Sequence, residues 1–419
     1  MYTTNDKNLP MRISTRVQRC VMMFLEFFIW GGWFVTLGTF LGNTINASDG
    51  EIALAFSTQS WGAILAPFII GIIADRYFNA EKILGILHLS GALLLYLMYR
   101  TTSFEDFYPF VLGYMILYMP TLALVNSVSF NQMKNPAKEF SLVRVFGTLG
   151  WVVAGLLISY WFNWDSETGI SNGLLRNTFL MTAIASAILG IFSFTLPKTP
   201  PKAISAKKPS LKELMGLDAL ELFKDRNFLV FFISSILICI PLAFYYQNAN
   251  PFLVELGMEN PTGKMTLGQI SEILFMLLLP YFFTKFGFKK TIMIAMLAWV
   301  VRYILFAYGN VGELSFLLII GIGLHGICYD FFFVSGQIYT DSKAGEKYKS
   351  AAQGLITLAT YGVGMLIGFW IAGKISNLYL LENGTHIWET IWVYPAGFAF
   401  VVLMFFMLMF KSEKIDYKS

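Results

Sequence analysis

The residues of this chain that could do chemistry are a few charged side chains set inside long apolar stretches. Glu26, Glu272, Arg302 and Asp330 each lie well inside such a stretch. A charge at this depth in a membrane-spanning helix is costly and usually serves a function. An acid there can take up and release a proton, so these positions indicate proton movement rather than bond-making catalysis.

Glu272 is the strongest candidate among them. It lies near the middle of a stretch bounded by Lys264 and Lys285, and Gln269 precedes it by one turn on the same helix face. A helix that only packs does not need such a polar patch. Because the ionised form is costly at this depth, we expect Glu272 to hold a proton and to donate to a ligand hydroxyl. Loss of the proton would then weaken that contact and favour release.

The other three charges have plainer explanations as well. Arg302 and Asp330 could form a buried pair that joins adjacent helices, and Glu26 could bond to a neighbouring helix. Glu26 and Asp330 are also reserve candidates for proton coupling, beside Glu272.

Aromatic residues, which make up 17% of the chain, stand beside several of these polar residues. The groups are Trp30 and Trp33 near Glu26, Trp151 near Arg144 and Thr148, Tyr245 and Tyr246 beside Gln247 and Asn248, and Tyr329 beside Asp330. Aromatic faces combined with hydrogen-bonding side chains suit a flat, polyhydroxylated ligand such as a nucleoside, by stacking on the base. They suit a sugar nearly as well, and composition does not choose between the two.

Residue types that hold metals or cofactors are scattered along the chain. They are Cys20, Cys239 and Cys328, and His88, His325 and His386. These positions have no metal-ligand or disulfide spacing, and no GxxxxGK[ST] phosphate-binding sequence occurs. We therefore expect no metal, no cofactor, no ATP-driven pumping and no enzymatic activity.

Composition shows which elements must position the candidate residues. The chain has 419 residues, of which 56% are apolar and only 13% charged, with a mean hydropathy of +0.61. Soluble domains have roughly 25% charged residues, and about 20 apolar residues span a bilayer. The sequence predicts twelve membrane-spanning helices, at about 20–41, 55–74, 83–99, 108–130, 145–163, 178–196, 227–247, 267–284, 291–308, 314–337, 352–373 and 391–410.

Lysine and arginine positions predict the orientation of these helices. An even number of spans puts both termini on one side, and that side carries 25 of the 30 Lys and Arg residues, against four on the other. Because cytoplasmic loops are enriched in Lys and Arg, we expect both termini to be cytoplasmic. The protein is then a multi-pass protein of the inner membrane.

The longest connection divides the predicted helices into six and six. It is rich in Pro and Lys at first, and then a capping-box sequence, Ser210 to Glu213, precedes apolar residues at a helical spacing. We expect an N-terminal half at 1–196, a cytoplasmic linker with an amphipathic helix on the membrane at 197–226, and a C-terminal half at 227–419. Two related halves that face each other suit a transporter with a site at the membrane midplane.

The sequence Gly71-Ile-Ile-Ala-Asp75-Arg76, between the second and third stretches, resembles the signature of the major facilitator superfamily. In that superfamily the acid and the base at this turn form a conformational latch, which implies this role for Asp75 and Arg76. The alternative is a plain charged turn.

Several longer motifs resemble the bacterial nucleoside:proton symporters of that superfamily. They are Phe24-Leu-Glu26-Phe-Phe-Ile-Trp30-Gly-Gly-Trp33, Tyr118-Met-Pro120, Arg144-Val-Phe-Gly147-Thr148-Leu-Gly150, Gly216-Leu-Asp218-Ala, Gln269-Ile-Ser-Glu272 and Ala298-Trp-Val-Val-Arg302 with Phe306-Ala-Tyr-Gly309. The resemblance covers essentially the whole chain. It implies an all-α, twelve-helix fold and a monomeric permease that imports nucleosides with protons by alternating access and binds no nucleic acid.

The resemblance also implies a set of ligand-facing residues. Arg144, Thr148, Gln269 and Glu272 match the family, and Trp151 supplies an aromatic face where the enteric permeases have phenylalanine. The role of Arg144 rests on the resemblance alone, because its place near the end of a stretch would otherwise make it an interfacial residue.

Two departures from the family pattern concern the identity of the substrate. A glutamine and an asparagine of the family become Ala243 and Tyr246, with Gln247 nearby, and a tyrosine and a phenylalanine become His325 and Tyr329. A sugar:proton symporter of the same superfamily is therefore the main alternative, and a polytopic membrane receptor or enzyme is the more distant one.

Overall fold

The computed structural model describes residues 13–69, 78–131, 133, 136–201 and 217–413. These residues are almost entirely helical and contain no strand; an isolated β-bridge joins Leu380 to His386. The predicted latch of Asp75 and Arg76 lies outside the described residues, as does the stretch 202–216 of the predicted linker.

The first group of helices runs from the start of the described chain to residue 193. Its members are α1 (Ile13–Phe34), α2 (Leu37–Thr44), α3 (Asp49–Ile69), α4 (Ala80–Arg100), α5 (Phe104–Asn131), α6 (Pro136–Leu156), the π-helical η3 (Leu157–Trp161), α7 (Glu167–Ser171), η4 (Leu174–Arg176) and α8 (Asn177–Ser193). We call this group the N-terminal bundle.

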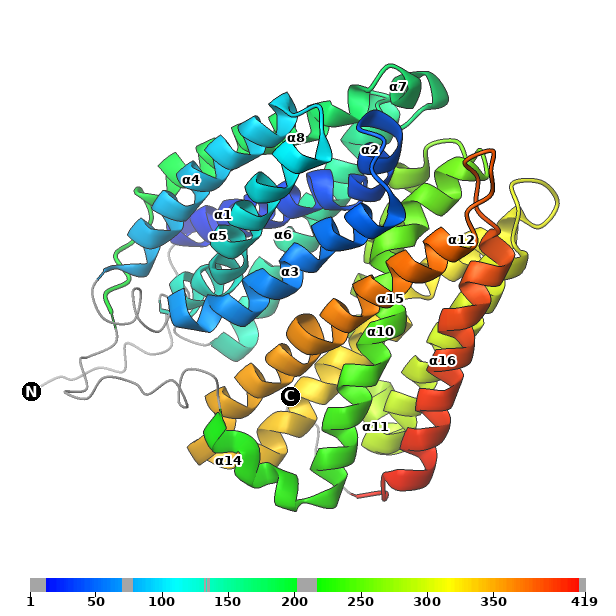
Figure 1. Ribbon diagram of the computed structural model, residues 1–419. Coiled ribbons are helices and arrows are strands. Elements are labelled where there is room, and N and C mark those ends of the chain that lie inside the picture. The colour runs from blue at the N-terminus through cyan, green and yellow to red at the C-terminus, as the bar shows by residue number, and fades with distance from the viewer. Residues whose placement is uncertain (1–12, 70–77, 132, 134–135, 202–216, 414–419) are drawn as a thin grey trace, which may run out of the picture.

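The second group begins with a 3-10 helix and runs to residue 409. Its members are η5 (Leu217–Lys224), α10 (Arg226–Glu255), α11 (Pro261–Tyr308), α12 (Ser315–Gly323), α13 (His325–Tyr329), the π-helical η6 (Asp330–Val334), α14 (Ser335–Thr357), the π-helical η7 (Leu358–Gly364), α15 (Met365–Leu378) and α16 (Trp388–Met409). We call this group the C-terminal bundle. The two bundles lie side by side, in blue to green and in green to red (Figure 1).

The described helices supply the twelve predicted spans. Ten helical stretches of the described residues are long and apolar enough to cross a membrane. One of them, Pro261–Tyr308, contains two helices that meet at Gly287, whose φ of 74° is a left-handed value that glycine adopts without strain. The 21-residue α3 adds a further span. The all-α, twelve-helix prediction is therefore confirmed.

Close packing inside the bundles depends on glycine. A Cβ on Gly150 of α6 would come within 2.1 Å of the Phe24 carbonyl oxygen of α1, and a Cβ on Gly62 of α3 would come within 2.4 Å of the Met115 carbonyl oxygen of α5. Small residues are what allow membrane helices to approach this closely. The Gly150 contact brings α1, which carries Glu26, directly against α6, which carries Trp151.

The described end of the predicted linker is helical and packs against α14. The structure has a 3-10 helix at Leu217–Lys224, and its apolar residues Ala219, Leu222 and Phe223 pack against the α14 residues Ala344 and Ala352. The predicted amphipathic helix begins outside the described residues, and one of its apolar residues, Leu220, stays 42% exposed. Its position on the membrane therefore stays a prediction.

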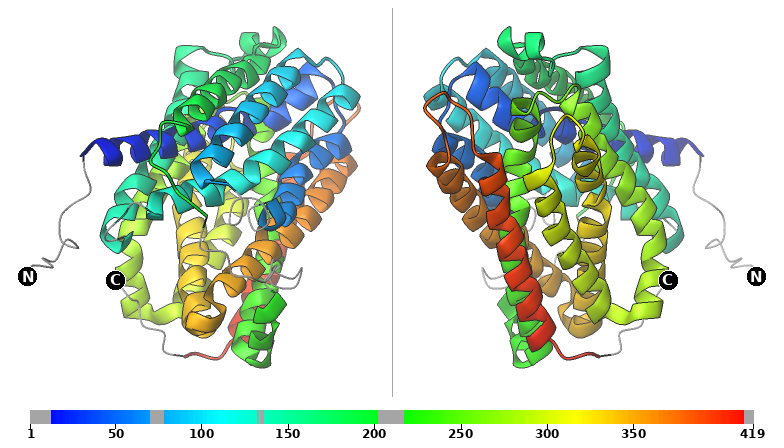
Figure 2. Two further views of the ribbon diagram at one scale, coloured as in Figure 1. Left: turned by 90° about the vertical axis from the view of Figure 1, so that its left-hand side faces the viewer. Right: turned by 90° about the vertical axis from the view of Figure 1, so that its right-hand side faces the viewer.

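The bundles contact each other mainly at the end where α2 and α7 lie, at the top of Figure 1. Two backbone groups at the start of α11 bond to the N-terminal bundle: Thr262 N–H donates to Asp165 Oδ2 (3.0 Å) and Gly263 N–H donates to Ser159 Oγ (2.6 Å). Thr39 of α2 also donates to Asn250 of α10 (2.7 Å). We call this set of contacts the inter-bundle junction. In the turned views of Figure 2 one bundle lies in front of the other.

A single glycine sets the closeness of α3 and α15 at the junction. A Cβ on Gly373 would lie 2.5 Å from Ala53 Cβ and 2.9 Å from the Asp49 carbonyl oxygen, so Gly373→Ala must push the bundles apart at this end. We expect the distance between spin labels on Asn172 and Asn383 to increase in this variant. Gly397→Ala is the matched control, because no other atom lies within 4 Å of its Cβ position. Equal distances in both variants would show that Gly373 does not control closure.

Candidate functional site

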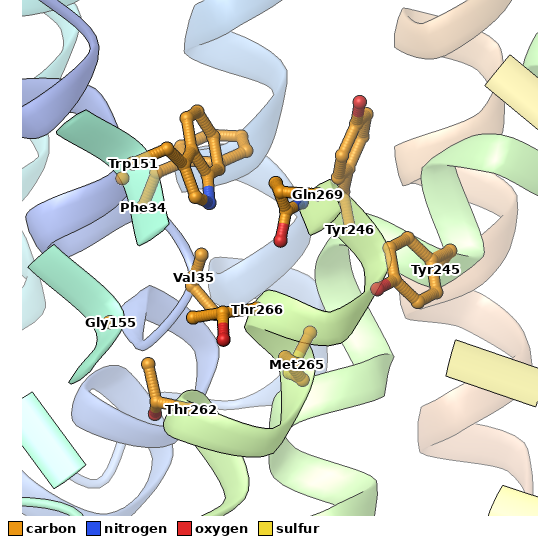
Figure 3. Close-up of a pocket in the computed structure, with 11 residues that line it drawn as sticks. Phe34, Val35, Trp151, Gly155, Tyr245, Tyr246, Thr262, Met265, Thr266 and Gln269 are labelled. Atoms are coloured by element: carbon orange, nitrogen blue, oxygen red, sulfur yellow. The ribbon is translucent and has the colours of Figure 1, made fainter. Parts of the chain in front are cut away.

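A central pocket lies between the bundles and includes Thr262 of the inter-bundle junction in its lining (Figure 3). The N-terminal bundle contributes apolar and aromatic faces, with Trp151 of α6 and Phe34 of α1. The C-terminal bundle contributes Tyr245 and Tyr246 of α10 and a row of polar residues on α11. The full lining is Gly31, Phe34, Val35, Trp151, Gly155, Tyr245, Tyr246, Thr262, Met265, Thr266 and Gln269. Aromatic faces on two sides and hydroxyl and amide groups on a third can hold a planar, polar ligand.

The polar row of α11 follows the helical repeat. Thr262, Thr266 and Gln269 are spaced by four and then three residues, so they share one face of the helix. Sequence reasoning identified only Gln269 and Glu272, although the same spacing extends back to Thr262 and could have revealed both threonines. Phe34 was also missed, because nothing in the sequence distinguishes it from the many phenylalanines that only pack.

Next to the pocket, Glu272 belongs to a chain of three polar side chains. His325 Nε2 lies 2.9 Å from Glu272 Oε1, and Arg302 Nη1 lies 3.0 Å from His325 Nδ1. Arg302 and His325 are almost fully buried, whereas Glu272 keeps 18% of its side chain exposed. These three side chains therefore run from the interior of the C-terminal bundle to the carboxylate of Glu272, which is still partly exposed.

Arg302 does not pair with Asp330 as the sequence suggested. Its guanidinium lies 3.5 Å from the centre of the Tyr245 ring and donates to His325, while neither carboxylate oxygen of Asp330 has a hydrogen-bond partner in the described structure. Residues five apart on a helix point about 140° away from each other. The face that brings His325 to Arg302 therefore turns Asp330 elsewhere.

Asp330 begins the π-helical segment η6, and π-helical turns are frequent at functional sites. Its carboxylate is fully buried and experiences the charges of Glu272 and of Arg144, which belongs to the other bundle. The adjacent Tyr329 bonds to Tyr361 (2.6 Å) and experiences the same two charges. Glu272 and Arg144 therefore both lie near Asp330 and Tyr329, although they belong to different bundles.

Glu26 takes part in a separate network inside the N-terminal bundle. Its Oε2 lies 2.8 Å from His88 Nε2, its Oε1 accepts from Thr121 (2.6 Å), and its backbone oxygen accepts from Tyr118 (2.8 Å). Glu26 and His88 are both buried and do not line the central pocket. Trp30 lies between the network and the pocket, 5.7 Å from Tyr118 and 5.5 Å from Trp151 between ring centres.

The predicted ligand-facing residues have different locations. Trp151, Tyr246 and Gln269 line the pocket, and Glu272, His325 and Tyr329 lie in the polar region next to it. Arg144 and Thr148 are half-buried on the α6 face that also carries Trp151, with the Arg144 guanidinium 4.1 Å from the centre of the Phe27 ring. Gln247 instead turns to α15, where its amide donates to Phe369 O and accepts from Gly373 N–H, both at 3.3 Å.

A titratable cluster closes the inter-bundle junction at its rim. His386, in the connection between α15 and α16, bonds through Nδ1 to Glu255 (2.8 Å) and lies 3.3 Å from both carboxylate oxygens of Asp49 through Nε2. Glu255 ends α10 and Asp49 begins α3, so the imidazole joins the two bundles. Burial alone would lower the pKa of His386, but its hydrogen bonds to Asp49 and Glu255 outweigh burial and raise that pKa to about 9.

This cluster predicts a pH-dependent junction. A raised pKa means that the protonated histidine stabilises the contact fully below the ordinary pKa of about 6.5, and that this stabilisation is lost as pH rises through about 9. We expect labels on Asn172 and Asn383 to separate over that range, and the step to vanish in His386→Gln. The three native cysteines are buried, so introduced cysteines can be labelled selectively. A step that persists in the variant would assign the transition to another group.

Known proteins resemble the chain over nearly its whole length. The family model for the nucleoside H+ symporters matches residues 11–415. YegT of Escherichia coli (strain K12) is 42% identical over 408 residues, covering 96% of this chain and 95% of YegT. The nucleoside permease NupG of the same organism is 31% identical over 418 residues, covering 96% and 97%. A crystal structure of the nucleoside transporter NupG matches with a TM-score of 0.84 at 30% identity, covering 96% of this chain and 100% of that one.

Twelve helices in two bundles around a central polar site define a secondary transporter of the major facilitator type. The chain belongs to the family of nucleoside:proton symporters. It is a multi-pass membrane protein that transports nucleosides together with protons, and it is not an enzyme. The predicted family, fold and function are confirmed, and the sugar, receptor and enzyme alternatives are not supported.

Proposed function

We propose that the protein imports nucleosides by alternating access, with the substrate bound in the central pocket and the coupled proton carried by Glu272 and Asp330. The observation that supports this most directly is that Trp151 of one bundle and Gln269 of the other line a single pocket. A ligand held by both bundles can couple their movement, because its contacts change whenever they separate.

The binding mode follows from the chemistry of the lining. The base stacks on Trp151, and Phe34 and Tyr246, whose rings lie 5.9 Å apart, extend the aromatic surface beside it. The ribose hydroxyls then lie toward Gln269 and toward Glu272 one turn further along α11. Arg144, Thr148, His325 and Tyr329 complete this proposed site, and Gln247 contributes through the junction rather than by direct contact.

Proton coupling rests on the two acids of the C-terminal bundle. Glu272 has one oxygen bonded to His325 and is partly exposed, so its other oxygen can take a proton and donate to a ribose hydroxyl. Asp330 is buried without a hydrogen-bond partner, and an unpaired buried carboxylate costs several kcal/mol. We therefore expect Asp330 to be protonated in this conformation. Glu26 stays in reserve, since its network lies inside one bundle.

The proposed orientation places both termini in the cytoplasm of a cell with an inner membrane, and the inter-bundle junction on the outer side. The halves 1–196 and 227–419 would then rock about the central site as a monomer. We expect a reporter fused after Ser419 to read as cytoplasmic and one inserted at Asn383 to read as external. The reverse pattern would overturn the orientation and leave transport itself untouched.

The experiment that tests the proposed function is uptake into proteoliposomes under an imposed proton gradient. A panel of radiolabelled nucleosides and hexoses is offered, with a protonophore as the control. We expect at least one nucleoside to accumulate with the gradient and to lose that accumulation when the protonophore is added. Accumulation of a hexose but no nucleoside would contradict the proposed substrate. Equal uptake with and without the proton gradient would contradict the proposed proton coupling.

A further inference from the structure

Apart from the His386–Glu255 contact at the rim, each bundle has one pair of a glutamate and a histidine among its described residues. Glu26 and His88 lie in the N-terminal bundle, and Glu272 and His325 in the C-terminal bundle, with closest N···O distances of 2.8 and 2.9 Å. In each pair Nε2 of the imidazole faces the carboxylate. The pairs differ in what Nδ1 faces, and the partner of one ring nitrogen determines whether the other carries a proton.

In the N-terminal bundle, Nδ1 of His88 faces an acceptor. Ser186 Oγ lies 3.2 Å from His88 Nδ1, but this hydroxyl already donates its single hydrogen to the His88 backbone oxygen (2.9 Å). Only a protonated Nδ1 can then bond to Ser186. One further proton lies between His88 Nε2 and Glu26 Oε2. The pair is therefore neutral as a whole, and its histidine is free to become an imidazolium.

In the C-terminal bundle, Nδ1 of His325 faces a donor. A guanidinium has only N–H donors and stays charged, so Arg302 Nη1, 3.0 Å away, requires an unprotonated Nδ1. The ring proton of His325 must then lie on Nε2, where it donates to Glu272 Oε1. The guanidinium is fixed by its stacking on the Tyr245 ring and has no freedom to move away.

We propose that Arg302 is a positioning residue that keeps His325 a neutral Nε2–H donor, so that Glu272 alone takes up the proton that this chain of residues carries. The inference rests on the proposed coupling role of Glu272. A second proton on His325 would place two cations 3.0 Å apart, with an N–H facing an N–H. The histidine therefore orients the carboxylate without competing for the proton.

The other groups that face His325 do not compete for this role. The titratable and charged residues around it are Arg302 and Glu272 from the two parts of α11, Tyr245 from α10, and Cys328 and Tyr329 from its own helix. Tyr245 and Tyr329 stack on the imidazole, with ring centres 5.3 and 5.8 Å away. Removal of Arg302 would therefore leave His325 free to form an ion pair with Glu272, as His88 can with Glu26.

The first test reads the tautomer directly and needs no transport. The chain has only three histidines, so the nitrogen resonances of ¹⁵N-histidine-labelled protein in lipid nanodiscs can be assigned with one substitution at a time. We expect His325 to show an unprotonated Nδ1 and a protonated Nε2 between about pH 5 and 8. His88 should show a protonated Nδ1 and serves as the internal control. A protonated Nδ1 on His325 in wild-type protein would overturn the proposal.

The second test replaces the positioning residue. In Arg302→Met the donor and the charge are lost, and we expect His325 to gain a proton on Nδ1 and the midpoint of pH-dependent uptake to move to higher pH by about 1 unit. Arg302→Lys is the conservative control, because lysine is also a charged group that only donates. It should keep the unprotonated Nδ1 and the wild-type midpoint.

The two variants separate this role from a structural one and from the proposed function. A guanidinium that only supports the fold would lower uptake at every pH without moving the midpoint or the Nδ1 resonance, and that result would overturn the inference. If wild-type protein showed the expected tautomer but no proton-driven nucleoside uptake, the proposed function would fail while the tautomer assignment stood.

Discussion

Glu272→Gln is expected to abolish accumulation of nucleoside against a gradient while leaving exchange of nucleoside across the membrane. Glutamine keeps the shape of the side chain, and its amide oxygen can still accept the bond from His325 Nε2 that Glu272 Oε1 accepts over 2.9 Å. What it removes is the ability to gain and lose a proton. The ligand contact is then fixed in its neutral form, so the proton gradient no longer drives release into the cell.

The measurement compares gradient-driven uptake with counterflow in the same proteoliposomes. Counterflow should stay within a few-fold of wild type, whereas accumulation should fall to the level seen with a protonophore. Asp330→Asn tests the second proposed proton carrier in the same assay, and Glu26→Gln is the comparison, because the Glu26 network lies inside the N-terminal bundle. If Glu272→Gln still concentrates nucleoside as wild type does, the coupling role moves to one of those two acids.

The fold could be predicted largely from the sequence because the bilayer imposes a simple rule on it. The length of an apolar stretch is a local property, so each span can be predicted without knowledge of its neighbours, and the predicted stretches are helices in the structure. The break in α11 was visible as well. The predicted spans end at 284 and resume at 291, and the structure has Gly287, with its left-handed φ, between them.

The candidate site was predictable where it depends on one helix. Gln269 and Glu272 share a face of α11 because of their spacing alone. The bond between Glu272 and His325, by contrast, depends on how α11 approaches α13. A Cβ on Gly326 would lie 2.5 Å from the backbone of Ser271, so this glycine permits the approach. The pairing of Arg302 with His325 rather than Asp330 follows from the same packing. The spacing of residues along the sequence does not reveal how two helices pack.

Long-range charge pairs at the rim of the protein were also beyond the sequence. His386 and Asp49 are 337 residues apart and belong to loops or helix ends that have no apolar pattern. They meet only because the two bundles close at that end. The composition of each separate segment therefore does not reveal the contact between His386 and Asp49.

Trp151→Ala is expected to weaken nucleoside binding by about 1–3 kcal/mol, the usual range for stacking of a base on an aromatic side chain. That loss corresponds to an increase in Kd of about 5- to 150-fold. Trp151→Phe should be much milder, since it keeps a smaller aromatic face. Isothermal calorimetry on purified protein measures both, and a hexose offered in parallel should show no comparable dependence on the ring.

The control for Trp151 comes from the same span. Trp161, in η3, is 75% exposed, so Trp161→Ala removes the same side chain without changing the pocket. Trp151 also packs against Trp30, with ring centres 5.5 Å apart, so its loss leaves a void that lowers the thermal stability of the N-terminal bundle. The two effects are separable, because bound nucleoside should raise the melting temperature of wild type and of Trp161→Ala strongly, but that of Trp151→Ala only weakly. An unchanged Kd in Trp151→Ala would show that the base does not stack on Trp151. The tyrosines of α10 would then be the stacking surface.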